Sequence, residues 1–249
     1  MEEESKYISR FRIKISEVDA KNRFKIHCLM NYMQEAAWKN AGALGFSSYD
    51  LLKNGVTWVM NRISLEVQQL PGHLDEIIVD TWPSGQDKYF VYRDYKVSTV
   101  EGEVIARATS NWVVLDIKTR KLTSVPDYIK NARFDVDRGN LERVRGKVNF
   151  NPGLSDHSYP VHVSWLDMDL NGHVNNSNYF KWLMDALPEQ HHENHSISQM
   201  DISFMAEGYN GEQLDVQSYI NEGGKLHQRI YSNTNSRTLV SATSHFNKN

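Results

Sequence analysis

The sequence predicts an α+β fold made of two similar halves, and three observations support this prediction. Each half begins with one amphipathic helical segment and continues with a run of strand-like segments. The strands are separated by Pro- and Gly-containing turns and not by further helices, which favours antiparallel hairpins over βαβ units. Short segments also recur in the same order along the chain, as expected from an internal duplication.

The recurring segments are separated by offsets that shrink slowly, which indicates a shortened second copy. Three matches carry this interpretation. They are Val18-Asp19 with Leu166-Asp167, Ile63-Ser64-Leu65 before Pro71-Gly72 with Ile202-Ser203-Phe204 before Asn210-Gly211, and Ala108-Thr109-Ser110-Asn111-Trp112 with Ala242-Thr243-Ser244-His245-Phe246.

The first half predicts one helix and four long strands. Apolar residues between Leu29 and Leu44 recur at i, i+3, i+4 and i+7, and Gly42 and Gly45 suit the helix end. β-Branched and aromatic residues then alternate in TWVMNRISLEVQ, EIIVDTW, KYFVYRDYKVST and EVIARATSNWVVLD. We expect the helix to lie across the concave face of a curved antiparallel sheet.

The second half repeats this order. A helix is predicted through about 177–187, with strands near 197–207, 213–220, 225–233 and 238–247. The polar, turn-rich stretch between the copies is predicted to be an ordered connection. The expected organisation is therefore a first domain over 1–130, a connector over 131–158 and a second domain over 159–249.

Composition excludes several classes of protein. The 249 residues carry 28 Lys and Arg against 31 Asp and Glu, so the net charge of −3 argues against a general nucleic-acid binder. The single cysteine, Cys28, forms no internal disulfide and no thiolate metal site, which favours a reducing compartment. No apolar run reaches the roughly 18 residues of a membrane span, and the start MEEESKYISRFRIK lacks signal- or transit-peptide character. We expect a cytoplasmic protein without membrane contact.

The densest group of polar side chains is the segment WLDMDLNGHVNNSNYF before the second helix. Asn171-Gly172 marks a turn that places Asp169 and His173 on either side of it. A carboxylate, an amide and an imidazole beside a helix N-terminus can form a hydrolytic site, because the free N–H groups stabilise an oxyanion. Turn formation and helix capping alone also explain such a cluster, so both interpretations stay open.

The two copies differ at this point. The corresponding first-copy stretch, VDAKNRFKIHC, has lost the Asp/Asn/His arrangement. This asymmetry predicts that one copy performs chemistry while the other holds the substrate.

Several long strings together resemble the acyl-acyl-carrier-protein thioesterases, which are tandem hotdog-fold enzymes. The resemblance runs from about Phe11 to about His245 and rests on TWVMNRISLEV, EIIVDTWPSG, YRDYKVST, ARATSNWVVLDIKTRKLTSVPDYI and DMDLNGHVNNSNYFKWLMDAL. It implies hydrolysis of the thioester that joins a fatty acyl chain to the phosphopantetheine arm of acyl carrier protein. It implies no cofactor and no metal.

The resemblance also implies a catalytic set, namely Asp169, Asn171 and His173 from DLNGH and Glu207 from SFMAEGYNGE. Family members often carry a Cys directly after this Glu, but here the position is Gly208. A water attack assisted by Glu207 or His173 is therefore expected, and the sequence leaves open which of the two takes the proton.

Two binding surfaces follow from the same resemblance. The acyl pocket is expected in the first copy, lined by Leu29, Met33, Ala36, Trp58 and Met60. The alternative is that these residues are ordinary core residues. Acyl carrier proteins are acidic, so Arg143 and Arg145, within a basic run that includes Arg133, Arg138 and Lys147, are candidates for docking. The alternative is a solvated connector.

Other interpretations remain. The spacing of His191, His192 and His195 fits metal ligands, but an exposed loop is the expected explanation. An acyl-CoA thioesterase using the same DxNxH element, a non-catalytic acyl-binding hotdog protein and a dehydratase-like hotdog protein are the competing functions. The doubled chain with one inactive copy favours the carrier-protein substrate, and a homodimer of such chains is compatible with the fold.

Overall fold

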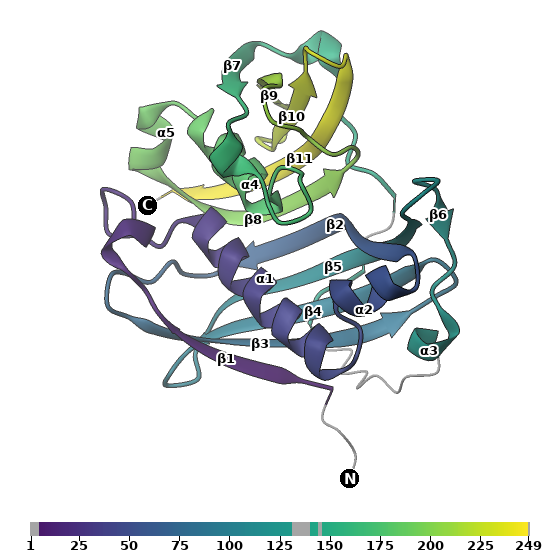
Figure 1. The fold of residues 1–249 in the computed structure, drawn as a ribbon. Helices are drawn as coiled ribbons and strands as arrows, with labels where there is room; N and C mark the ends of the chain where they lie inside the picture. The colour runs from purple at the N-terminus through teal and green to yellow at the C-terminus, as the bar shows by residue number, and fades with distance from the viewer. Residues whose placement is uncertain (1–4, 131–139, 144–145, 249) are drawn as a thin grey trace. The chain divides into compact units, whose positions relative to one another are not determined.

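The computed structural model describes residues 5–130, 140–143 and 146–248, and it divides into two compact units, 1–144 and 145–249. Each unit holds one principal helix and one antiparallel sheet, coloured purple to teal and green to yellow in Figure 1. The α+β prediction is therefore confirmed.

The first unit places its strands in the order β1-β3-β4-β5-β2, with the short β6 paired to β5. All of these pairs are antiparallel. Its elements are β1 Tyr7–Arg12, η1 Ile15–Glu17, α1 Ile26–Ala43, α2 Ser48–Lys53, β2 Val56–Val67, β3 Glu76–Gln86, β4 Phe90–Thr99, β5 Val104–Asp116, β6 Leu122–Thr123 and α3 Asp127–Lys130.

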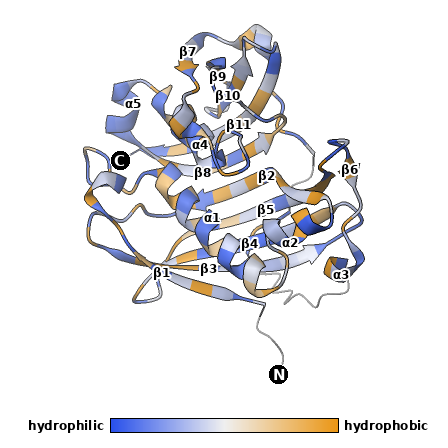
Figure 2. Cartoon of the chain, in the orientation of Figure 1, coloured by the Kyte–Doolittle hydropathy of each residue, from blue (hydrophilic) through white to orange (hydrophobic). Residues whose placement is uncertain are grey.

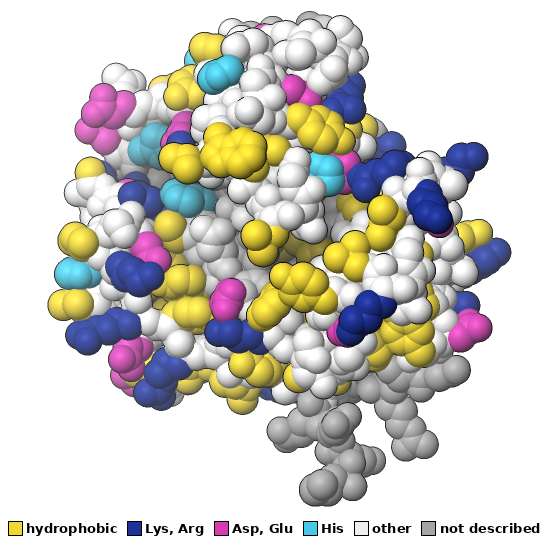
Figure 3. Space-filling view, viewed as in Figure 1, with side chains coloured by type: hydrophobic (Ala, Val, Ile, Leu, Met, Phe, Trp, Pro, Cys, Tyr) yellow, Lys and Arg dark blue, Asp and Glu magenta, His cyan; other side chains and the backbone are white. Residues whose placement is uncertain are grey.

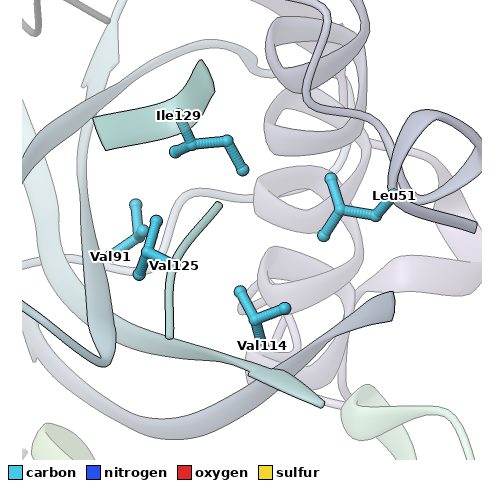
Figure 4. Packing of buried hydrophobic residues seen from close by; sticks show 5 residues of the cluster. All are labelled: Leu51, Val91, Val114, Val125 and Ile129. Atoms are coloured by element: carbon cyan, nitrogen blue, oxygen red, sulfur yellow. The ribbon is translucent and has the colours of Figure 1, made fainter. Parts of the chain in front are cut away.

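The helix α1 lies across this sheet (Figure 1), and its residues are partly hydrophobic and partly hydrophilic, as expected of a helix that packs on one side (Figure 2). Leu29, Met33, Ala36 and Ala37 fall on its buried side, at the helical spacing that predicted it. A second apolar cluster forms where α2, α3 and the chain before α3 pack against the sheet (Figure 4). Its members are Leu51, Val91, Val114, Val125 and Ile129.

The second unit repeats the same arrangement, with strand order β8-β11-β10-β9-β7 and antiparallel pairs throughout. Strand by strand, β7, β9, β10, β11 and β8 stand where β1, β3, β4, β5 and β2 stand in the first unit. Its elements are η2 Pro152–Leu154, β7 His157–His162, η3 Trp165–Asp167, α4 Asn176–Asp185, α5 Glu189–Asn194, β8 His195–Phe204, β9 Gln213–Ile220, β10 Leu226–Ser232 and β11 Arg237–Lys248.

Besides the two-residue β6, two strands were not predicted from the sequence, β1 and β7. Each is an edge strand that pairs with one neighbour, β3 or β9. β7 contains Pro160 and buries only Val161, so its residues carry almost no apolar signal. β7 also begins at His157, inside the stretch expected to be connector. Among the described residues no helix is long and apolar enough to cross a membrane.

Candidate active site

The predicted polar loop folds as a tight turn between η3 and α4. Met168 and Val174 form an isolated antiparallel bridge, and the Asp169 N–H donates to the carbonyl of His173 at 2.7 Å. Gly172 takes the left-handed conformation with φ of +76°, which other residues adopt at a cost. The turn therefore holds Asp169 and His173 directly opposite each other.

Asp169 uses its carboxylate to shape this turn. Its Oδ1 accepts the Asn171 N–H at 2.8 Å and the His173 N–H at 3.4 Å. Its Oδ2 accepts the Asn171 side-chain amide at 3.2 Å. Both oxygens are thus engaged within the loop, so Asp169 orients Asn171 and His173.

His173 and Glu207 come together from separate parts of the unit. Glu207 follows β8, and its Oε2 lies 3.3 Å from Nε2 of His173. The two side chains are 24% and 25% exposed, so the pair is sheltered while solvent still reaches it. An imidazole and a carboxylate at this distance can share and transfer a proton.

A second layer of residues, which sequence reasoning missed, holds this pair. The Tyr209 hydroxyl donates to Glu207 Oε2 at 3.1 Å, and the Tyr209 ring meets the His173 ring edge-on at 5.3 Å between centroids. Arg237, on β11, donates to the Glu207 carbonyl at 2.7 Å and to the buried Glu212 carboxylate at 3.3 Å. Tyr209 lies two residues beyond Glu207 in EGYNGE and was open to prediction, whereas nothing near Arg237 in the sequence points to the site.

Gly208 has no room for a side chain. A Cβ there would lie 2.8 Å from the Tyr179 hydroxyl, 3.0 Å from Val174 Cγ2 and 3.2 Å from Leu239 Cδ1. The Tyr179 hydroxyl also accepts the Gly208 N–H at 3.0 Å. The single thiol of the chain, Cys28, is buried in α1, and burial raises its pKa to about 11. Neither position supplies a nucleophilic thiolate.

The N-terminus of α4 lies beside the turn. Asn175 is its N-cap, with its side-chain oxygen accepting both the N–H and the hydroxyl of Ser177 at 3.0 Å. The backbone of Asn175 also donates to the carbonyl of Asp167 at 2.9 Å, which ties the helix start to η3. The arrangement can activate a water molecule at His173 and Glu207 next to a helix end that favours negative charge.

The first unit contains a loop with nearly the same backbone hydrogen bonds. Residues 14–25 repeat the backbone hydrogen bonds of residues 164–175 except that from Met168 to Trp165, and they include the isolated bridge, here Val18 with Phe24. The Asp19 carboxylate accepts the N–H groups of Lys21 and Arg23, both at 2.9 Å. The equivalent positions are Asp19 and Asp169, Lys21 and Asn171, Arg23 and His173, and Phe24 and Val174.

This equivalence corrects the sequence comparison, which matched Asp19 with Asp167. Asp19 occupies the place of Asp169, two residues further along than Asp167, so the first copy keeps this aspartate and has lost the amide and the imidazole. It has also lost the carboxylate of Glu207. The Phe24 N–H donates to the Pro71 carbonyl, and the equivalent Val174 N–H donates to the Gly208 carbonyl. Pro71 is therefore equivalent to Gly208, and the residue before it, Leu70, is equivalent to Glu207.

The predicted acyl-pocket residues all lie in the first unit. Leu29, Met33 and Ala36 are buried on α1 and Met60 is buried on β2. Trp58 packs against the cluster of Figure 4, and its ring N–H donates to the Phe46 carbonyl at 2.8 Å.

The basic residues are partly placed. Arg143 donates to the Ser84 carbonyl, and its guanidinium lies 4.5 Å from the Tyr92 ring centroid. Arg145 lies outside the described residues, as do Arg133 and Arg138. Figure 3 shows Lys and Arg side chains mixed with Asp and Glu on the visible face.

The prediction that the three histidines lie on an exposed loop was wrong. His191 and His192 lie on the short helix α5, with His195 at the start of β8, and all three are half-buried instead of standing on an exposed loop. The His191 ring stacks on that of His195 at 4.6 Å and meets Phe246 edge-on. Among the described residues there is no group of three or more ligating side chains that could hold a metal ion.

Comparison with known proteins shows the family of the chain. The family model for the acyl-ACP thioesterase N-terminal domain matches residues 4–132, and that for the C-terminal domain matches residues 154–248. The chain belongs to the acyl-ACP thioesterase family. The chain is 31% identical over 223 residues to a chloroplastic palmitoyl-acyl carrier protein thioesterase of Gossypium hirsutum, which covers 81% of this chain and 52% of that protein.

Solved structures of acyl-ACP thioesterases share the fold. One from Bacteroides thetaiotaomicron has a TM-score of 0.88 at 21% identity, and the alignment covers 98% of both chains. The 12:0-ACP thioesterase of Umbellularia californica has a TM-score of 0.85 at 22% identity, again with 98% of both chains covered. The predicted tandem hotdog-like fold is thus confirmed, and the chain spans about half the length of the curated relatives it matches.

Proposed function

We propose that this protein hydrolyses the thioester of fatty acyl-acyl carrier protein, releasing free fatty acid and the carrier with its phosphopantetheine thiol. The observation that carries the proposal is the His173–Glu207 pair, 3.3 Å apart and beside the N-terminus of α4. Membership of the acyl-ACP thioesterase family supports the choice of substrate.

In the proposed reaction a water molecule attacks the thioester carbonyl carbon. His173 or Glu207 takes a proton from the water, and the carbonyl oxygen gains negative charge. The C–S bond then breaks, and the leaving thiolate receives a proton from the site. The contact between Tyr209 and Glu207 keeps the carboxylate aimed at His173 throughout these steps.

Asp169 and Asn171 have supporting parts in this proposal. Asp169 fixes the turn, because its two oxygens bind the N–H groups and the amide of the loop. Asn171 and the first turn of α4 stabilise the charge that develops on the carbonyl oxygen. A carboxylate already engaged in the turn is poorly placed to be the proton acceptor, which leaves His173 and Glu207 for that step.

The remaining assignments are proposals of the same kind. The acyl chain is proposed to bind in the first unit among Leu29, Met33, Ala36, Trp58 and Met60, and Arg143 and Arg145 are proposed to contact the acidic carrier. A cytoplasmic location is proposed because a single cysteine suits a reducing compartment. A homodimer of the whole chain is proposed as the assembled form.

Free-thiol release tests the function. The purified protein is assayed on acyl carrier proteins bearing chains of increasing length, beside the matching acyl-CoAs, with His173→Ala as the blank. Preferential release from the carrier substrates is the expected result and gives chain length directly. Equal or faster turnover of acyl-CoA would replace the proposed substrate with the coenzyme A thioester. No release from either class would leave an acyl-binding protein.

A further inference from the structure

The outer face of the second sheet carries a cation that the proposed reaction does not use. Arg229 lies on β10, directly after Gln228, whose side-chain amide donates to the Leu183 carbonyl of α4 at 2.8 Å. Neighbouring residues of a strand point to opposite faces of a sheet. Arg229 therefore lies on the face away from α4, and away from the loop that bears His173.

The Arg229 side chain is fixed in place. Its Nε donates to Gln217 Oε1 at 2.7 Å, from the position directly opposite on β9. Its guanidinium carbon lies 5.1 Å from the ring centroid of Phe150 and 4.8 Å from that of Tyr231. Phe150 is itself packed on Tyr219 at 5.3 Å. The hydrogen bond uses Nε, and the two rings lie beside the guanidinium. None of these contacts is a hydrogen bond from the terminal nitrogens.

No anionic partner balances this charge in the described part of the chain, where no ion pair joins Arg229 to a carboxylate. Burial lowers its pKa from the ordinary value of arginine, and no carboxylate opposes the shift. A cation held this way, with its remaining donors free, gains energy when an oxyanion binds the guanidinium fork.

Arg229 lines an open hollow of about 430 Å³ together with Gln217, the chain that leads into β7 and the first two residues of β7. Ser158 lies opposite Gln217 in the strand pairing. The Ser158 hydroxyl forms no hydrogen bond within the part of the chain that the structure describes, so it can donate to a ligand. Asp156 is the one carboxylate on the lining; it is exposed, and it opposes a multiply charged anion. The remaining lining residues are Pro152, Ser155 and His157.

We propose that this hollow is a binding site for a phosphate group, with Arg229 as the principal contact and Ser158 as a further donor. The planar fork of arginine and a neighbouring hydroxyl suit a tetrahedral oxyanion. The site is separate from the His173–Glu207 pair, so its occupancy does not depend on the proposed hydrolysis. The phosphate can be free inorganic phosphate or the phosphate of a phosphopantetheine arm.

Titration calorimetry of the full chain with inorganic phosphate tests the proposal. Arg229→Gln is expected to weaken phosphate binding at least about tenfold, because a charge-assisted bidentate contact is lost. Asp156→Asn is expected to tighten it several-fold, since a like charge is removed. Arg10→Gln, which removes the same charge from the first unit, is the matched control and is expected to bind phosphate as the parent does.

Two results would overturn the site: no saturable binding of millimolar phosphate by the parent protein, or parent affinity in Arg229→Gln. Should Arg229→Gln fail to fold, Asp156→Asn decides, and an unchanged affinity in that exposed variant rejects the proposal. Pantetheine 4′-phosphate and pantetheine identify the source. If pantetheine 4′-phosphate binds more tightly than inorganic phosphate and pantetheine does not bind, the ligand is the phosphate of the arm. If pantetheine 4′-phosphate and inorganic phosphate bind with equal affinity, the ligand is free phosphate. If the arm is the ligand, Arg229→Gln should also raise the KM for acyl carrier protein substrate, whereas free phosphate as the ligand predicts thiol release equal to that of the parent.

Discussion

The loops at 14–25 and 164–175 share one backbone and differ in what they can do. Both are closed by an aspartate that accepts two backbone N–H groups, Asp19 in one and Asp169 in the other. In the first loop Asp19 also forms an ion pair with Arg23 at 2.8 Å, whereas in the second the equivalent His173 faces Glu207. The aspartate thus belongs to the turn in both copies, and the chemistry depends on the residues that differ.

The loops also differ in their exposed side chains. Trp165, Leu166 and Leu170 are 77%, 92% and 97% exposed in the second loop. The first loop has Ser16 and Ala20 in place of Leu166 and Leu170, and an Ile15 that is 69% exposed in place of Trp165, so two of the three positions do not require a large apolar residue. Exposed apolar side chains grouped on one loop are typical of an interaction surface, and here that surface adjoins only the copy that carries the His173–Glu207 pair.

The largest effect is expected for Glu207→Gln. It keeps the shape of the side chain but removes the charge beside His173, so thiol release should fall by about 10²–10⁴-fold. Leu70→Gln, at the equivalent position of the first unit, is the control and should leave turnover near that of the parent. Near-normal release by Glu207→Gln would remove the carboxylate from the reaction.

A clear loss of stability is expected for Gly208→Ala, because its Cβ would meet Tyr179, Val174 and Leu239 at 3.2 Å or less. Overpacking of this kind costs about 1–3 kcal/mol in the free energy of unfolding. Gly42→Ala in α1 is the contrast, since its Cβ would find nothing within 4 Å and should be neutral or stabilising. Urea unfolding measures both, and a stability for Gly208→Ala equal to that of Gly42→Ala would show that the space around Gly208 is larger than described.

A smaller effect is expected at Asp19, whose role should be purely structural. Burial would raise the pKa of Asp19, but hydrogen bonds from the backbone and side chain of Arg23 outweigh it and hold the pKa below its usual value of 3.8. A group with a depressed folded pKa stabilises the fold above its unfolded pKa and loses that contribution as the pH falls through the folded value.

Asp19→Asn should therefore lower stability by about 1 kcal/mol near neutral pH and flatten the pH dependence of unfolding below about pH 4. Turnover measured where the variant is folded should match the parent. A large loss of turnover in folded Asp19→Asn would break the distinction between the two loops.

The smallest effect is expected for Arg143→Glu. If Arg143 contacts the carrier, reversing its charge should raise the apparent KM for acyl carrier protein a few-fold and weaken its salt dependence, with acyl-CoA turnover unchanged. Its contacts with Ser84 and Tyr92 make a stability control necessary, so unfolding is measured in parallel. Equal KM values for variant and parent would reject Arg143 as a docking residue.

Much of the fold was open to prediction because its signals are local. The helical spacing from Leu29 onward and the alternating strands are visible in the sequence, and α1, α4 and the long strands lie close to where they were expected. The edge strands β1 and β7 were missed because one-sided pairing requires little apolar patterning. The equivalence of Asp19 with Asp169 was also missed, since only backbone hydrogen bonds fix the register of the two loops.

The site could be predicted in part for the same reason. Asp169, Asn171 and His173 lie within one short motif, so their proximity follows from the turn. Glu207 was placed only through the family resemblance, and the contacts of Tyr209 and Arg237 depend on tertiary packing that no local pattern encodes.

The exchange of one residue between the loops tests the central claim that equivalent loops divide structure from chemistry. Thiol release from acyl carrier protein substrate is measured for His173→Arg and for Arg23→His, each confirmed as folded by its unfolding curve. We expect His173→Arg to lose turnover by at least about 10²-fold and Arg23→His to keep the rate of the parent. Substantial turnover in His173→Arg, or an equal loss in both variants, would contradict the assignment of the reaction to the second loop.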